Sequence, residues 1–245
     1  VITELLCHPL LTILKERKYS GFGLDLVQSV CRDVLHGLVQ IHKLGLVHCD
    51  VKPENVLTKT FSSREVKLID FGSCVCRGEP CYDQMQTIYY RAPETVFRRP
   101  IEQKIDIWSV GCMAAELFLG LPLFPAHSEP HLIYLINEAL GPFGPSMSDN
   151  TKYFTDGQLK SKEELEAMEN EDFAELPNYF RGKRLREHIS NFPYPCGCTE
   201  EFRVKEERNR QQFLSFLELV LSIDPSGRAT ASEALQHHFI TDTIE

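Results

Sequence analysis

Apolar residues recur at steps of three and four along residues 24–44, which is the spacing of one face of an α-helix. The face consists of Leu24, Val27, Val30, Val34, Leu38 and Ile41. Gly45 follows directly, and a glycine just beyond the last periodic residue is a common helix stop. The pattern predicts an amphipathic helix of roughly twenty residues that ends at Gly45.

Two short runs, 55–57 and 66–69, carry the branched and alternating residues of β-strands and are separated by a polar turn. We predict that they pair and hold the preceding loop, 48–55, beside the following loop, 70–72. Residues 105–119 are apolar almost all round, which predicts a buried central helix.

Residues from about 142 to 210 are more polar and are punctuated by proline. Within them, Ser161 followed by Glu164 forms a capping-box pattern that predicts the start of a short acidic helix. An apolar helix is expected at 213–221, and Thr230 with Glu233 predicts a second capping box and a last helix. The chain is thus predicted to be mainly α, of the α+β class, with one domain and a surface insertion at about 142–210.

The composition excludes some classes of function. The formal net charge of −9 over 245 residues argues against nucleic acid as a main partner. No apolar run approaches the roughly 20 residues that span a bilayer, and no signal peptide opens the chain. The nine cysteines, an odd number, favour reduced thiols in the cytoplasm or nucleus. The chain starts at Val1, and residues 1–6 suggest a strand entered midway, so we expect a fragment of a longer protein.

The loop 48–55, HCDVKPEN, places an acid, a lysine and an asparagine within six residues, and Asp70 follows the second strand. Asn55 and Asp70 offer oxygen ligands, which suit Mg²⁺ shared with phosphate oxygens and water. Asp50 could take or orient a hydroxyl proton, and Lys52 could neutralise a phosphoryl group in transfer. The alternative is a pair of acidic turns beside short strands.

The loop HCDVKPEN resembles the catalytic loop of eukaryotic protein kinases, and LIDFG at 68–72 resembles their magnesium-binding loop. Three later motifs follow in order. YRAPE at 90–94 resembles the end of the activation segment, DIWSVG at 106–111 the central helix of the large lobe, and DPSGR at 224–228 the segment whose arginine pairs with Glu94.

The resemblance implies an ATP- and Mg²⁺-dependent protein kinase. Asp50 would be the catalytic base, Lys52 would neutralise the phosphoryl group, and Asn55 and Asp70 would bind Mg²⁺. Thr87 resembles the threonine that bonds the catalytic aspartate and lysine in serine/threonine kinases. A further set of residues is expected to support this site, with Glu54 beside the nucleotide and structural roles for His48, Phe71, Glu94, Asp106 and Arg228.

Several details resemble the CMGC group, and within it the dual-specificity tyrosine-regulated and homeodomain-interacting kinases. Cys49 replaces the usual arginine before the catalytic aspartate, and DFGS and ELFLGLPLFP fit the same branch. Gln84 stands where that branch has its activating tyrosine, with Tyr82 two residues away. Arg91 is expected to face the substrate groove and to favour proline after the phosphorylated residue.

Residues 1–6 resemble the end of the small lobe and the hinge, and 7–241 the large lobe. Thr3 would be the gatekeeper, the Glu4 carbonyl and Leu6 amide would bond adenine, and Leu57 would floor its pocket. Ordinary strand core explains Leu57 nearly as well. No glycine-rich phosphate loop, strand lysine or helix glutamate precedes this region. We therefore expect that the chain needs an upstream small lobe and is inactive alone.

The sequence thus predicts a protein serine/threonine kinase, with dual specificity as an alternative, that acts on protein substrates, needs ATP, and contacts neither nucleic acid nor membrane. Two rivals remain. A pseudokinase scaffold would have no reason to keep Asp50, Lys52, Asn55 and Asp70 together. A small-molecule phosphotransferase would share the catalytic loop but would not need APE at 92–94 or the DIWSVG helix.

Overall fold

The structure is a computed structural model that describes residues 4–60, 63–149, 152–170, 172–173 and 184–244. The helices are α1 (Leu10–Glu16), α2 (Leu24–Lys43), α3 (Pro93–Val96), α4 (Lys104–Leu119), α5 (Glu129–Leu140), α6 (Lys162–Glu169), α7 (Leu185–Ser190), α8 (Glu200–Val220), α9 (Ala231–Ala234) and α10 (His238–Thr241). Three 3₁₀ turns accompany them, η1 (Pro53–Asn55), η2 (Phe71–Ser73) and η3 (Ile88–Tyr90). The strands are β1 (Leu46–Val47), β2 (Val56–Thr58), β3 (Val66–Leu68), β4 (Val75–Cys76), β5 (Phe154–Thr155) and β6 (Gln158–Leu159).

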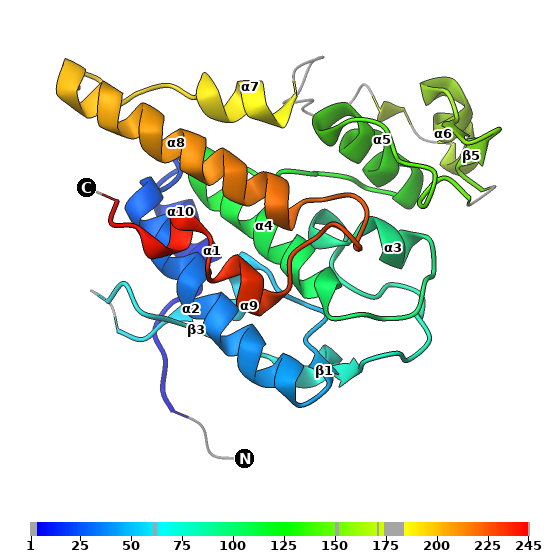
Figure 1. Cartoon of the computed structure of the whole chain (residues 1–245), viewed down its shortest axis with the longest axis horizontal. Coiled ribbons are helices and arrows are strands. Elements are labelled where there is room, and N and C mark those ends of the chain that lie inside the picture. Colours follow the sequence, from blue (N-terminus) through cyan, green and yellow to red (C-terminus); the bar gives the residue numbers. More distant parts are fainter. Residues whose placement is uncertain (1–3, 61–62, 150–151, 171, 174–183, 245) are drawn as a thin grey trace.

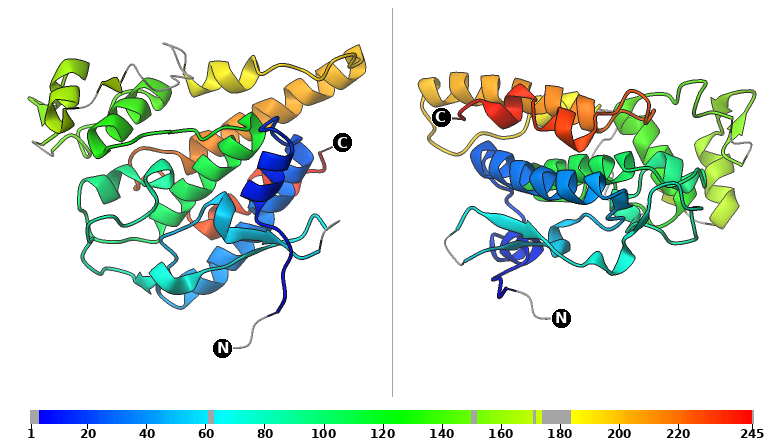
Figure 2. Two further views of the ribbon diagram at one scale, coloured as in Figure 1. Left: turned by 180° about the vertical axis from the view of Figure 1, so that it is seen from behind. Right: turned by 60° about the horizontal axis from the view of Figure 1, so that its bottom comes forward.

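The elements form three layers, seen edge-on in the right panel of Figure 2. The central layer is α2 beside α4, the outer helical layer is α8 with α9 and α10, and the short strands β1 to β4 with α1 cover the opposite side. Figure 1 shows α8 lying across α4 along much of its length. Helix α4 is therefore covered on both sides, which explains why its sequence is apolar almost all round.

The predicted long helix and central helix are confirmed. Helix α2 ends at Lys43, and Gly45 takes the left-handed conformation expected of a glycine stop, with φ of 74°. On α4, Ile105–Phe118 are buried throughout. Trp108 is fully buried, stacks on Phe124 and has the guanidinium of Arg228 over its ring. The core thus forms around α4.

The described strands make three separate antiparallel pairs, β1 with β4, β2 with β3, and β5 with β6. In the predicted pair, Val56 lies opposite Leu68 and Thr58 opposite Val66. The backbone N–H of Ile69 also donates to the carbonyl of Asn55 at 2.9 Å. This register brings the ends of loops 48–55 and 70–72 together, as predicted.

Both capping boxes are present. Ser161 and Glu164 exchange hydrogen bonds at the start of α6, and Thr230 and Glu233 do so at the start of α9. The last helix is shorter than expected, because α9 ends at Ala234 and His237 caps a separate α10 by accepting from the N–H of Phe239. The expected helical ending is thus divided into two single turns.

The helix expected at 213–221 begins thirteen residues earlier, at Glu200, where Thr199 caps it by accepting from the N–H of Phe202. The early half is polar and shows no apolar periodicity, so the sequence pattern missed it. It is ordered by contacts outside the helix. Arg210 donates to the carbonyl of Phe192 at 2.5 Å and lies over the ring of Tyr194 at 4.3 Å.

The predicted insertion, 142–210, contains β5, β6, α6, α7 and the first half of α8. Figure 1 shows α6 with β5 beyond α5, at one end of the molecule. Phe173 joins this region to α5 by stacking on His131, with ring centroids 4.4 Å apart. Of the expected opening strand, 1–6, the structure describes residues 4–6. Residues 4–6 lie outside any strand, and Thr3, the expected gatekeeper, lies outside the described residues.

Candidate active site

The catalytic loop, residues 48–55, contains η1, connects β1 to β2 and lies beside helix α4. It is attached to the helix through Asp106, whose carboxylate is fully buried. One oxygen accepts the backbone N–H of His48 at 2.8 Å and the other accepts that of Cys49 at 2.9 Å. His42 places Nε2 2.8 Å from the same carboxylate. These contacts are compatible with the structural role that the resemblance implied for Asp106, which remains a prediction.

This attachment holds Cys49 in a left-handed backbone conformation, with φ of 66°. Such a conformation is uncommon for a residue with a side chain, and it is favourable here because both neighbouring N–H groups reach one charged acceptor. The Cys49 side chain points into the core, where it is fully buried. Burial and the charge of Asp106 raise the pKa of its thiol, which stays protonated and uncharged.

His48 closes the other side of the loop. Its Nε2–H donates to the carbonyl of Ile69 at 3.0 Å, while Nδ1 accepts the N–H of Asp50 at 3.2 Å. These two partners determine which ring nitrogen carries the proton. The ring of Phe71 packs edge-on against His48, with centroids 5.2 Å apart. The catalytic loop and the 70–72 loop are therefore joined through His48, which is compatible with its predicted structural role.

Asp50, Lys52, Asn55 and Thr87 form one hydrogen-bonded set. Thr87 Oγ1 donates to Asp50 Oδ1 at 2.8 Å, and Asn55 Nδ2 donates to Asp50 Oδ2 at 2.8 Å. Lys52 Nζ lies 2.8 Å from Asp50 Oδ2 and donates to Thr87 Oγ1 at 2.9 Å. Thr87 is thirty-seven residues from Asp50 in the chain, and the fold brings them into contact.

These contacts set the charge of Asp50. Burial alone would raise the pKa of its carboxyl, but hydrogen bonds from Lys52 and Thr87 and the positive charge of Lys52 outweigh burial and lower the pKa below its ordinary value. Asp50 is therefore a carboxylate at neutral pH. A carboxylate can accept a proton from a hydroxyl or orient that hydroxyl for attack.

Asn55 and Asp70 lie at the same end of the β2–β3 pair. Asn55 is 7% exposed. Its side-chain amide makes two hydrogen bonds, to the carbonyl and to the carboxylate of Asp50, and both are donated by the nitrogen. Its amide oxygen is thus the atom that could bind a metal. Asp70 is exposed in a left-handed conformation, with φ of 62°, and one carboxylate oxygen accepts from the N–H of Gly72. Two oxygen donors at a solvent-facing edge fit Mg²⁺, which keeps several waters and phosphate ligands.

Among the described residues there is no group of three or more His, Cys, Asp or Glu side chains placed to hold a metal. A site that depends on Asn55, Asp70 and substrate phosphates is compatible with that finding.

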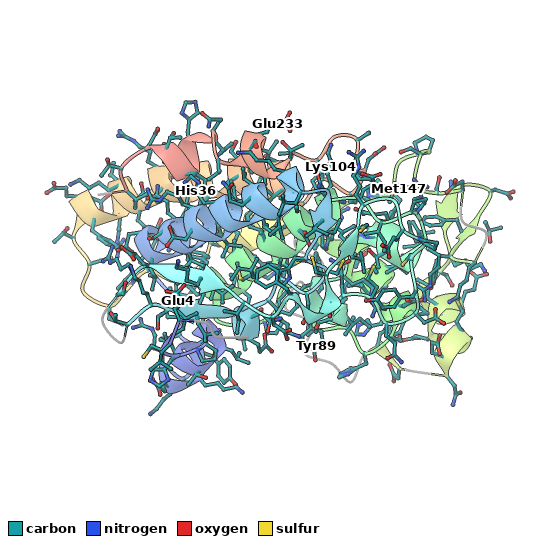
Figure 3. The ribbon with its side chains drawn as sticks, turned by 90° about the horizontal axis from the view of Figure 1, so that it is seen from below. Glu4, His36, Tyr89, Lys104, Met147 and Glu233 are labelled. Carbon is teal, nitrogen blue, oxygen red and sulfur yellow. The ribbon has the colours of Figure 1, made fainter. Side chains whose placement is uncertain are left out.

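The predicted adenine-site residues lie at the N-terminal edge. Glu4 is exposed and its carboxylate is 3.3 Å from the ammonium of Lys67, opposite Leu57 in the β-pair. Leu6 and Leu57 are half-buried, and Pro9 bridges to Leu57. In Figure 3, Glu4 and Tyr89 both lie on the side of the molecule away from Glu233. These positions are compatible with the predicted roles, which remain predictions.

Glu54 is half-buried in η1 rather than turned to open solvent. One of its carboxylate oxygens is buried and has no hydrogen-bond partner among the described residues. Its charge acts on Tyr90 and Glu116, which are joined by a 2.6 Å hydrogen bond from the tyrosine hydroxyl. The structure thus places Glu54 beside helix α4, and its predicted contact with the nucleotide remains a prediction.

The activation segment, residues 73–93, ends on a buried salt bridge between Glu94 and Arg228, as predicted. The Nη2 group of Arg228 donates to Glu94 at 3.0 Å. Arg91 is also buried. Its guanidinium donates to the carbonyl of Gln86 from Nη2 at 2.9 Å and from Nε at 3.3 Å, and to Glu129 on α5 at 3.0 Å.

Sequence reasoning missed Gln86, which receives these bonds and is itself 5% exposed. The signal available in the sequence was slight, a glutamine between Met85 and Thr87 in a polar loop. A cavity of about 500 Å³ is lined by His42, Lys104 and Thr230, with other residues, but not by Asp50, Lys52, Asn55 or Thr87. Lys104 and Glu233 mark that side of the molecule in Figure 3.

The model of the protein kinase domain family matches residues 1–240. The chain therefore belongs to the protein kinase domain family. This match begins at residue 1, so it does not support the expectation that the small lobe is missing. None of the helices among the described residues is long and apolar enough to cross a membrane.

Relatives confirm the branch. The chain is 35% identical to the dual specificity protein kinase YAK1 homolog of Arabidopsis thaliana over 97% of its length and 28% of the relative. It is 33% identical to human dual specificity tyrosine-phosphorylation-regulated kinase 3, with 98% of the chain and 40% of the relative covered. Mouse homeodomain-interacting protein kinase 2 is 33% identical, with 99% and 21% covered. The chain spans less than half the length of these relatives.

Proposed function

We propose that this protein transfers the γ-phosphoryl group of ATP to serine or threonine hydroxyls of proteins. The observation that carries the proposal is the hydrogen-bonded set of Asp50, Lys52, Asn55 and Thr87, with Asp70 at the adjoining strand end. Phosphoryl transfer needs a carboxylate at the hydroxyl, a cation at the phosphate and oxygen ligands for the metal. The three requirements are met within this set.

Each residue has a separate task. Asp50 orients the attacking hydroxyl and accepts its proton, and Thr87 and Asn55 keep the carboxylate turned toward the acceptor. Lys52 faces the γ-phosphate, where its ammonium offsets the negative charge of the transferring group. Asn55 and Asp70 would hold Mg²⁺, which screens the phosphate charges when bound.

The contacts of Arg91 support a preference for substrates that carry proline directly after the phosphorylated residue. Both Nη2 and Nε of Arg91 donate to the carbonyl of Gln86, so this carbonyl is already satisfied. A substrate backbone N–H placed there would find no free acceptor, whereas proline has no N–H to satisfy. The proposal is therefore a proline-directed kinase.

Two other readings are weaker. A non-catalytic scaffold has no need for the hydrogen-bond donors around Asp50. These donors lower the pKa of the Asp50 carboxyl and keep it charged, which serves proton transfer and not scaffolding. Dual specificity is favoured by the names of two relatives, which carry that term. Tyrosine-containing peptides are therefore a second arm of the test.

The test uses the full-length protein, ATP and Mg²⁺ with serine, threonine and tyrosine peptides in pairs with and without proline. We expect transfer to serine and threonine that is lost on chelation of Mg²⁺ and strongly reduced in Asp70→Asn. Glu65→Gln, a change at an exposed acid just before β3, is the matched control. ATP binding without transfer to any substrate would favour the scaffold. The same assay on these 245 residues tests the prediction that they are inactive alone.

A further inference from the structure

Gln86 is a buried amide in the middle of the activation segment. Its backbone is left-handed, with φ of 60°, a conformation that a residue with a side chain takes at some cost. The proposed function uses only its backbone carbonyl, which receives Arg91. Its side chain makes a separate set of contacts.

The donor side of the amide faces helix α4. Nε2 donates to the hydroxyl of Ser109 at 2.9 Å and lies 3.2 Å from the carbonyl of Ile105. Ser109 in turn donates to the carbonyl of Tyr90 at 2.7 Å. The amide nitrogen thus attaches the segment to the central helix, whose position is set by the core.

The acceptor side faces the end of the segment. Oε1 accepts the backbone N–H of Ala92 at 3.1 Å and the hydroxyl of Thr95 at 2.8 Å. Ala92 immediately follows Arg91, so this bond fixes the backbone on one side of Arg91 while the carbonyl of Gln86 holds its guanidinium on the other. A buried amide with both ends satisfied in this way is a strong constraint on local geometry.

We propose that the side chain of Gln86 is a positioning residue for substrate selection, which holds its own carbonyl under Arg91 so that the groove prefers proline after the acceptor. This inference rests on the proposed kinase activity. The bonds run to neutral groups within the chain, so the segment reaches this arrangement without a phosphate. Gln84, two residues earlier, is left-handed as well, with φ of 67°, but is exposed.

The two glutamines provide a matched pair. Gln86→Met keeps the length of the side chain but removes the hydrogen bonds of the amide, and Gln84→Met makes the same change at an exposed site with a similar backbone. Both are measured in the full-length protein with threonine peptides that carry proline or alanine after the acceptor. We expect Gln86→Met to lower the proline-to-alanine ratio of kcat/KM about tenfold, the size expected for loss of one or two hydrogen bonds, mainly through KM. Gln84→Met should leave the ratio unchanged.

The outcomes separate the inference from the proposed function. A wild-type protein that phosphorylates no peptide or protein overturns the proposed function, and the inference falls with it. An active wild type whose Gln86→Met variant loses activity equally on both peptides overturns the inference alone, because equal loss is what a structural role produces.

If Gln86→Met does not fold, Thr95→Val and Ser109→Ala each remove one partner of the amide. A fall of the ratio in both supports the inference, and an unchanged ratio in both overturns it.

Discussion

The catalytic loop and the activation segment are both attached to helix α4, but through different chemical groups. Each contains a left-handed residue with a side chain, Cys49 at φ of 66° and Gln86 at φ of 60°, and each is tied to helix α4. In the catalytic loop the tie runs from backbone N–H groups to the carboxylate of Asp106. In the activation segment it runs from the Gln86 side chain to Ser109.

The two attachments differ in whether they depend on a side chain of the attached loop. The bonds to Asp106 use backbone N–H groups of His48 and Cys49, so they do not depend on the type of side chain at position 49. The tie at Gln86 depends on the side chain itself. A substitution at Cys49 therefore keeps the backbone bonds to Asp106, whereas a substitution at Gln86 removes the bonds to Ser109 and Ala92.

Helix α4 binds both the catalytic loop and the activation segment through side chains on one face. Asp106, Ser109 and Glu116 follow one another at steps of three and seven residues, which place them along the same side of a helix. Glu116 accepts the hydroxyl of Tyr90 at 2.6 Å, so it fixes the segment beyond Gln86. The three polar residues interrupt a helix that is otherwise apolar, and each one positions a part of the site.

The largest effect is expected at Asp50, the residue that both loops position. Asp50→Asn removes the acceptor of the hydroxyl proton and should lower kcat by about 10²- to 10⁴-fold. ATP affinity should change by less than about threefold, because the metal ligands remain. Nucleotide titration and turnover of the full-length protein check this. An equal loss of ATP binding and turnover would refute the role of Asp50.

Asp106→Asn should break the tie of the catalytic loop. It replaces a fully buried carboxylate that accepts from two backbone N–H groups with an amide that carries donors of its own. The loss should reduce the free energy of unfolding by about 4 kcal/mol. Denaturant unfolding measures it. The control is Asp83→Asn, an exposed partner of Arg98, which should cost less than about 1 kcal/mol.

Glu116 should make stability depend on pH. Burial raises the pKa of its carboxyl to about 7, and the charge of Glu54 acts in the same direction, against the hydrogen bond from Tyr90. Between its ordinary pKa of 4.5 and about 7, the folded state keeps a proton that the unfolded state has lost. The contribution to stability is therefore fully present below pH 4.5, falls as pH rises through this window, and is level above it.

Glu116→Gln should remove about 3 kcal/mol of this pH-dependent loss. The measurement is the free energy of unfolding at intervals between pH 4.5 and 8. Glu218→Gln, at an exposed position of α8, is the control and should leave the profile unchanged. A profile of Glu116→Gln that matches the wild type would show that Glu116 does not titrate in this window.

The smallest effect is expected from removal of phosphate. The uncharged thiol of Cys49 cannot pair with a phosphate as an arginine can. Phosphatase treatment of the active full-length protein should therefore change kcat by less than about twofold. Mass spectrometry confirms that phosphate is gone. Complete loss of activity would mean that another cation of the segment holds a phosphorylated residue.

The elements whose signals are local could be predicted from the amino-acid sequence alone. The apolar spacing of α2, the glycine after it, and the capping boxes at Ser161 and Thr230 involve residues within one or two helical turns. Such features are readable because the interacting groups are close in the chain. The residue types of the catalytic set were readable as well, since proton transfer and metal binding need particular chemical groups.

The other features depend on contacts between residues that are far apart in the chain. The polar first half of α8 is ordered by Arg210 through contacts with Phe192 and Tyr194, and no periodicity marks it. Gln86 owes its importance to Ser109, twenty-three residues away, and Cys49 keeps its left-handed backbone through Asp106, fifty-seven residues away. Partners so distant in the chain leave no local pattern, and burial is what makes their hydrogen bonds decisive, because an unsatisfied polar group in the core costs more than one in water.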